Sequence, residues 1–170
     1  MRAALRWLVL SLPLLVAGCD LPGREQAGLP TSAEARRYFE RQGEPDSVAL
    51  SGNVVEVRFR QPPGQLRRGG SLWARVGPYV HLFSPGTREL FEAYGGVAAV
   101  RVIIITPAGE EVARAQLRRD TLSDILWRRS LNILGHALRE GTAQPSRLDE
   151  LVAWGEEYAE YRYNPKYVPE

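Results

Sequence analysis

Cysteine is almost absent from this chain of 170 residues, in which the only one is Cys19. Without a second thiol no intramolecular disulfide can form, so the packing of apolar side chains must stabilise the fold. Histidine is also rare, and neither His81 nor His136 lies in a zinc-binding pattern, which needs three or four nitrogen, sulfur or oxygen ligands. We therefore expect no metal and no other cofactor.

Sequence patterns of known catalytic sites are missing as well. A serine nucleophile needs a base and an oxyanion site, and no Gly-x-Ser-x-Gly segment occurs. Glycosidases need two carboxylates across a cleft, whereas the pairs at 110–111 and 156–157 are typical of solvated charge at a turn and on a helix surface. The sequence predicts no catalytic residues.

A basic excess is missing too. The 22 lysines and arginines face 20 aspartates and glutamates, and two of those arginines lie in the first 18 residues. The rest of the chain is therefore balanced in charge. Because a nucleic-acid-binding domain usually has a basic excess on one face, the sequence argues against nucleic acid as a partner.

The apolar run near the N-terminus, WLVLSLPLLVAG, is short and contains Pro13. A helix that spans a bilayer needs about 20 apolar residues. Arg2 and Arg6 precede this run and small residues follow it, a pattern typical of a secretory signal peptide. Its boundary, Val16-Ala17-Gly18-Cys19, resembles the lipobox of bacterial lipoproteins.

This resemblance implies that residues 1–18 are removed and that Cys19 and the new amino terminus are acylated. Two or more acyl chains attach a protein firmly to a bilayer. In enterobacterial lipoproteins an aspartate after that cysteine resembles an inner-membrane retention signal, so Asp20 favours the inner membrane, with the outer membrane as the alternative. Residues 19–31 follow as a flexible tether with an end-to-end distance of roughly 20 Å.

The next residues begin a single domain predicted over 32–163. Thr31 and Glu34 have the capping-box spacing for a helix over 32–42. Strict alternation over 53–60 predicts a half-buried strand with a short hairpin partner near 48–50. A loop over 61–70, a broken or kinked helix over 71–83 and a helix over 85–94 follow.

The clearest pattern is the β-branched run VAAVRVIIIT at 97–106, which a turn and a second strand over 111–119 follow. These segments predict a β-hairpin whose first strand is central and covered on both faces or nearly so. Helices are expected from 120 to 140 and from 146 onward. The fold class is thus α+β, a small two-layer sandwich with a mixed sheet of about three or four strands and helices mainly on one face.

Arginines on the predicted strands form a first candidate binding surface. Arg58 and Arg60 lie at the end of the first long strand, and Arg114 and Arg118 lie on the hairpin. If these strands are neighbours, the arginines line one exposed sheet face, ready to meet anionic headgroups or an acidic partner.

Tyrosines near the C-terminus form a second candidate surface. Tyr163 and Tyr167 follow the last predicted helix, the latter within an extended tail over 164–170. Tyrosine is enriched in interface cores, so these two residues are candidate partner contacts.

Together these features predict a membrane-anchored periplasmic lipoprotein that acts as a binding or accessory module of an envelope complex. Its partners would be the bilayer, through acylated Cys19, and another envelope protein. Two alternatives stay open. One is an envelope hydrolase with an unrecognised site, and the other is a periplasmic small-ligand carrier, which needs an apolar cavity between sheet and helices.

Overall fold

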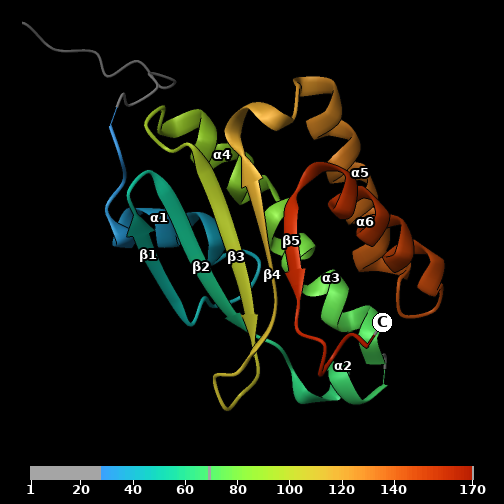
Figure 1. Ribbon diagram of the computed structural model, residues 1–170. Coiled ribbons are helices and arrows are strands. Elements are labelled where there is room, and N and C mark those ends of the chain that lie inside the picture. The colour runs from blue at the N-terminus through green and yellow to red at the C-terminus, as the bar shows by residue number, and fades with distance from the viewer. Residues whose placement is uncertain (1–27, 69, 170) are drawn as a thin grey trace, which may run out of the picture.

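The computed structural model of this protein describes residues 28–68 and 70–169. The predicted signal peptide, Cys19 and Asp20 lie outside the described residues. Within them the chain forms one mixed sheet with helices packed on one face, which confirms the expected α+β sandwich (Figure 1). The sheet has five strands, whereas the sequence predicted three or four.

The strands lie side by side in the order in which they occur along the chain. They are β1 (Ser47–Ser51), β2 (Val54–Arg60), β3 (Ala99–Ile105), β4 (Glu111–Arg118) and β5 (Glu160–Tyr163). β2 and β3 run parallel, and the other neighbouring pairs are antiparallel. A parallel pair needs a crossover connection, and here helices supply it.

The crossover between β2 and β3 consists of α2 (Pro63–Arg68), α3 (Gly70–Leu82) and α4 (Pro85–Ala93). α1 (Ser32–Phe39) precedes the sheet, and α5 (Asp124–Glu140) and α6 (Pro145–Tyr158) connect β4 to β5. A short 3₁₀ turn, Arg119–Thr121, follows β4.

Side-chain caps fix where the helices begin. The Glu34 amide donates to Thr31 Oγ1 at 3.2 Å and the Thr31 amide donates to the Glu34 carboxylate at 2.8 Å, so the predicted capping box of α1 is confirmed. Ser84 caps α4 through its hydroxyl oxygen, which accepts from the Thr87 amide at 3.2 Å. Ser123 caps α5, which sets its start a few residues later than the sequence predicted.

The tether predicted over 19–31 enters the described region at Gly28. The Gly96 amide donates to the Gly28 carbonyl at 3.3 Å, and Pro30 is buried. The last residues of the predicted tether therefore pack against the domain.

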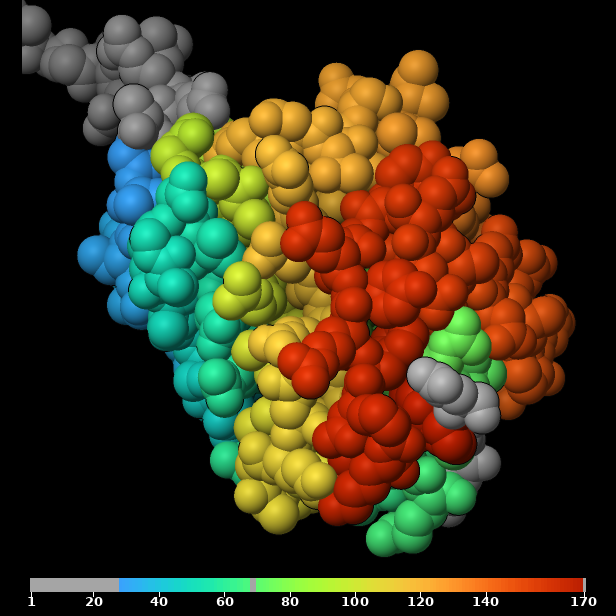
Figure 2. All heavy atoms as spheres, in the orientation of Figure 1, coloured from blue at the N-terminus to red at the C-terminus, as the bar shows by residue number. Residues whose placement is uncertain are grey.

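Alternation along the strands decides which side chains enter the core. The side chains of β2 and β3 that face the helices form its centre: Val55, Val57, Phe59, Val100, Val102 and Ile104. The intervening side chains point to the opposite face, which no described helix covers. Figures 1 and 2 show this open face toward the viewer, with β1 to β4 side by side.

The segment predicted as a broken or kinked helix over 71–83 is one continuous helix, α3, although it contains Pro78. Proline inside a helix removes a backbone hydrogen bond and clashes with the preceding turn, a loss of about 3 kcal/mol. Each large apolar side chain that the helix buries, such as Tyr79 or Leu82, contributes about 1.5–3 kcal/mol, so burial outweighs the loss. The loop expected over 61–70 is partly helical as well, because α2 lies within it.

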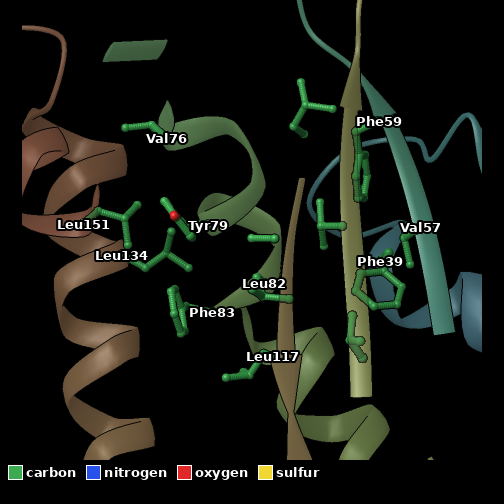
Figure 3. Close-up of a cluster of buried hydrophobic side chains, with 14 of the residues drawn as sticks. Phe39, Val57, Phe59, Val76, Tyr79, Leu82, Phe83, Leu117, Leu134 and Leu151 are labelled. Atoms are coloured by element: carbon green, nitrogen blue, oxygen red, sulfur yellow. The ribbon is translucent and has the colours of Figure 1, made fainter. Parts of the chain in front are cut away.

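Tyr79 lies where α3 meets α6. Its side chain is fully buried, and Figure 3 shows Leu134 and Leu151 beside it. A Cβ added at Gly155 would lie 2.4 Å from atoms of the Tyr79 ring, so only glycine lets α6 approach α3 this closely. The Tyr79 hydroxyl shares a hydrogen bond of 2.7 Å with the Tyr163 hydroxyl, which ties β5 to the same point.

The segment after β5 differs from the extended tail predicted over 164–170. The amides of Tyr167 and Val168 donate to the carbonyl of Asn164 at 2.9 and 3.0 Å, which makes a turn. Both side chains pack, half-buried, against the core. The turn brings apolar atoms into the core that an extended tail would leave in water.

Arg119 closes the C-terminal end of α4. Its guanidinium donates to the carbonyls of Val97 at 2.7 Å, Phe91 at 2.5 Å and Tyr94, and it lies 5.2 Å from the centroid of the Phe91 ring. A cation at a helix C-terminus pairs with the terminal carbonyls and with the helix dipole. Arg119 therefore stabilises the fold, unlike the adjacent Arg118 on the open face.

We expect Gly155→Ala to lower the free energy of unfolding by about 1–3 kcal/mol, because the new methyl group overlaps the Tyr79 ring. Gly64→Ala in α2 is the matched control, since a Cβ there meets nothing within 4 Å. Urea unfolding measures both variants. Equal losses of stability would show that α6 moves away from α3 at no cost.

We expect Arg119→Met to lower the free energy of unfolding by about 2–3 kcal/mol, because hydrogen bonds from a charged donor to α4 are lost. Arg118→Met should change it by less than about 0.5 kcal/mol, as is usual for an exposed side chain. Thermal unfolding of the two variants gives the comparison. A similar loss in both would rule out the capping role.

Candidate functional site

The open face of the sheet carries the four arginines that the sequence singled out. Arg58 and Arg60 project from β2, and Arg114 and Arg118 project from β4. The two strands are not neighbours, because β3 lies between them. β3 adds an arginine of its own, and so does β5. The six arginines, here called the arginine face, are Arg58, Arg60, Arg101, Arg114, Arg118 and Arg162.

One row across the sheet shows how this face is built. Four register partners on successive strands lie next to one another in this row: Arg58, Ile103, Arg114 and Arg162. Ile103 is only 2% exposed, although no described helix covers it. Because Arg58 and Arg114 lie directly across from it, we infer that their aliphatic stems cover it while their charged groups stay in water. The arginines thus serve both burial and surface charge.

Acidic groups neutralise part of the face. Glu56 lies between two of the arginines, 3.0 Å from Arg58 and 3.3 Å from Arg101. At the end of β2, Arg60 pairs with Asp46 at 2.5 Å. The half of the face near β1 is therefore close to electrical balance.

The half of the face near β5 keeps more positive charge. Arg114 pairs with Glu111 at 3.4 Å. Arg118 and Arg162 are exposed and have neither a hydrogen bond nor an ion pair with any residue that the structure describes. Two guanidinium groups are thus free to bind an external anion.

A shallow hollow of about 250 Å³ lies in this second half, over β3, β4 and β5. Its lining includes Arg101, Arg114, Gln116, Glu160 and Arg162. The Gln116 carboxamide oxygen accepts from Arg101 at 2.8 Å, which holds that guanidinium against β4. Arginine binds carboxylates through two parallel N–H donors, so the hollow suits a carboxylate presented by another molecule.

Tyr163 does not belong to this face. It lies on the helix side of β5, where its hydroxyl donates to Glu156 at 3.0 Å in addition to its bond with Tyr79. Arg75 completes the group, because it pairs with Glu156 at 2.7 Å and lies 5.9 Å from the Tyr163 ring centroid. Burial raises the pKa of Tyr163, so its hydroxyl stays protonated.

Tyr167 is also engaged within the chain. Its hydroxyl donates to Glu110 at 2.6 Å, and Lys166 Nζ reaches the same carboxylate at 2.7 Å. These bonds connect the turn after β5 to the β3–β4 hairpin. Both tyrosines thus use their hydroxyl groups within the chain, whereas the arginines of the open face point to solvent.

The sequence did not single out Arg101 or Arg162. Arg101 interrupts an apolar run. Because alternate residues of a strand share a face, a charged residue inside such a run indicates that one face of the strand is exposed to water. Arg162 stands between Tyr161 and Tyr163 near the end of the last predicted helix, where the sequence predicts no strand. Pairing with β4 is what places it on the arginine face.

His81 has the geometry of a packed ring rather than of an acid–base catalyst. It stacks on Phe59 with ring centroids 3.5 Å apart, and burial lowers its pKa from the ordinary 6.5 to about 4. Its ring is thus neutral at pH 7. His81 lines a pocket between α3 and the sheet, and the acidic residue in that lining, Glu44, is 89% exposed and pairs with Arg36 at 3.6 Å. It does not act as a partner for the imidazole.

His136 lies on the surface of α5. Its Nδ1 is 3.2 Å from Glu140, four residues later on the same helix. Such a pair is an ordinary surface interaction between successive turns. Among the described residues, no group of three or more His, Cys, Asp or Glu side chains converges in a way that could hold a metal ion.

No protein-family model, no curated protein and no solved structure matches this chain. None of the helices in the described ranges has the length and apolar character needed to cross a membrane. The residues assigned to lipidation and membrane sorting, Cys19 and Asp20, lie outside the described residues.

We expect His81 to make stability fall as the pH is lowered from about 6.5 to about 4. Between these two pH values the unfolded chain binds a proton at His81 and the folded protein does not. Lowering the pH through this range therefore favours the unfolded chain, whereas above about pH 6.5 the ring is neutral in both states and stability is not reduced. The slope is at most about 1.4 kcal/mol per pH unit.

Urea unfolding at a series of pH values measures this effect as the difference between the native protein and His81→Phe, which keeps an aromatic ring against Phe59. Gln144→Met, at an exposed residue that does not titrate, is the control and should retain the native slope. Parallel pH profiles for the native protein and His81→Phe would contradict the expectation.

Proposed function

We propose that this protein is a lipid-anchored periplasmic binding module of a cell-envelope complex, which docks through its arginine face onto an acidic surface of another envelope protein. The observation that carries the proposal is the uncovered sheet face with six arginines, two of which have no partner among the described residues. The anchor is the acylated Cys19 that the lipobox-like segment implies.

The distribution of charge supports this use of the face. Outside the leader the chain has equal numbers of acidic and basic side chains. Positive charge near β5 is therefore a local feature rather than a consequence of composition. Complementary charge on two surfaces accelerates their encounter and fixes the orientation in which they bind. A partner with carboxylates spaced to meet Arg118 and Arg162 matches the face.

A protein partner is favoured over anionic lipid. A basic patch strengthens membrane binding when a single acyl chain holds the protein only reversibly. A multiply acylated cysteine, in contrast, already attaches the protein firmly. A further weak attraction to headgroups adds little. The hollow beside Arg101 and Arg162 offers instead a shaped site, with an amide and a carboxylate beside the arginines.

The test is site-specific photo-crosslinking of the full-length protein in the cells that produce it. A photoreactive residue replaces Ala49, which is exposed on the open face of β1, and a second form has it at Glu157, exposed on α6. We expect one acidic envelope protein to crosslink at position 49 and not at 157. The double variant Arg118→Glu/Arg162→Glu should reduce this product about tenfold, which corresponds to about 1.4 kcal/mol.

The matched control is Arg37→Glu/Arg128→Glu, which makes the same charge change at two exposed helical arginines. It should leave the crosslink unchanged. Crosslinking to lipid alone, or to a protein that both double variants retain equally, would overturn the proposal.

A further inference from the structure

A pocket of about 450 Å³ lies on the other side of the sheet, between α3 and the ends of β2 and β3. Its walls include Phe59 and Ile104 of the sheet and Trp73, Gly77 and His81 of α3. The three helical residues share one face because they are four residues apart. The volume is within the range of about 300–1,000 Å³ that small-molecule sites occupy.

Three buried polar atoms in this pocket have no partner. Of all the buried side-chain nitrogens and oxygens in the described residues, those without a hydrogen bond are Gln42 Oε1, Gln61 Oε1 and His81 Nδ1. All three residues line this one pocket. An unpaired buried polar atom costs about 1–3 kcal/mol, so three of them together are expensive unless something binds there.

Gln61 shows that this arrangement is held in place. The residue is 4% exposed, its Nε2 donates to the Trp73 carbonyl at 2.8 Å, and its amide donates to the Ile105 carbonyl at 2.9 Å. The bond to Trp73 assigns the nitrogen of the carboxamide. The oxygen is therefore the atom left without a donor.

The character of the pocket determines which molecule fits. Two carboxamide oxygens require hydrogen-bond donors, and the stacked rings of Phe59 and His81 provide an apolar, flat surface. The imidazole is neutral at pH 7. The one guanidinium at the rim, Arg60, is already paired with Asp46 and with the Pro107 carbonyl. Nothing in the pocket favours a charged ligand.

We propose that this pocket binds a small uncharged molecule with a flat apolar body, whose N–H or O–H groups donate to Gln42 and Gln61 and pair with His81. The site is separate from the half of the arginine face near β5, because Arg118 and Arg162 do not line it; Arg60, at its rim, is the arginine that borders both regions. It goes beyond the proposed function and does not rest on it.

The probe for this test is benzamide, which is neutral, has a flat ring and carries two N–H donors. N,N-Dimethylbenzamide is the matched compound without donors. Both are titrated into the native, full-length protein in detergent while NMR follows the Trp73 indole signal, which Trp73→Phe identifies. We expect benzamide to shift this signal and to bind at least tenfold more tightly than the dimethyl compound.

Gln61→Met and His81→Phe each remove an unpartnered atom at nearly constant volume, and each should weaken benzamide binding at least tenfold. Gln144→Met, at an exposed glutamine, should not change it, and neither should Arg118→Glu/Arg162→Glu. The proposal is overturned if the two compounds bind alike, or if benzamide leaves the native signal unchanged. In that case the pocket holds water only. The paired compounds test the native protein, so the result stands even if a variant fails to fold.

Discussion

The close contact of α3 with α6 determines most of the remaining structure. α3 is buried on two sides, with the sheet on one and α6 on the other, and Tyr79 fills the second contact against Gly155. The Tyr79 hydroxyl then bonds to Tyr163, which positions β5 beside β4. Because β5 takes this position, Arg162 reaches the open face. A packing constraint in the core therefore places a charged group on the opposite surface.

On the open face, arginine side chains provide the cover that a packed helix usually gives to a central strand. Ile103 in the central strand is buried, and Arg58 and Arg114 lie directly across from it, where their aliphatic stems account for its cover. An arginine in this position loses little of its charge, since its guanidinium remains in water. The same arginines thus cover the strand and carry the positive charge of the surface. No described helix is needed on this side of the sheet, which stays open to a partner.

The two proposed binding regions depend on the same strand. Along β2 the alternating side chains send Arg58 to the arginine face and Phe59 to the wall of the pocket. A strand places successive side chains on opposite faces, so β2 contributes to both regions without either crowding the other. The sheet lies between the two regions, which meet at the end of β2, where Arg60 borders both.

The sequence by itself determined the local elements: the capped helices, the strand at β2, the β-branched β3 and the fold class. These follow from alternation and capping, which act between residues close in the chain. It also identified the lipobox-like segment and four of the six arginines. Only the tertiary structure decided that α3 continues through Pro78, that Glu160–Tyr163 is a strand, and that Tyr163 is internal. The tertiary structure also decided that Gln42, Gln61 and His81 meet in one pocket. Contacts between segments distant in the chain set all of these features, and no local pattern encodes them.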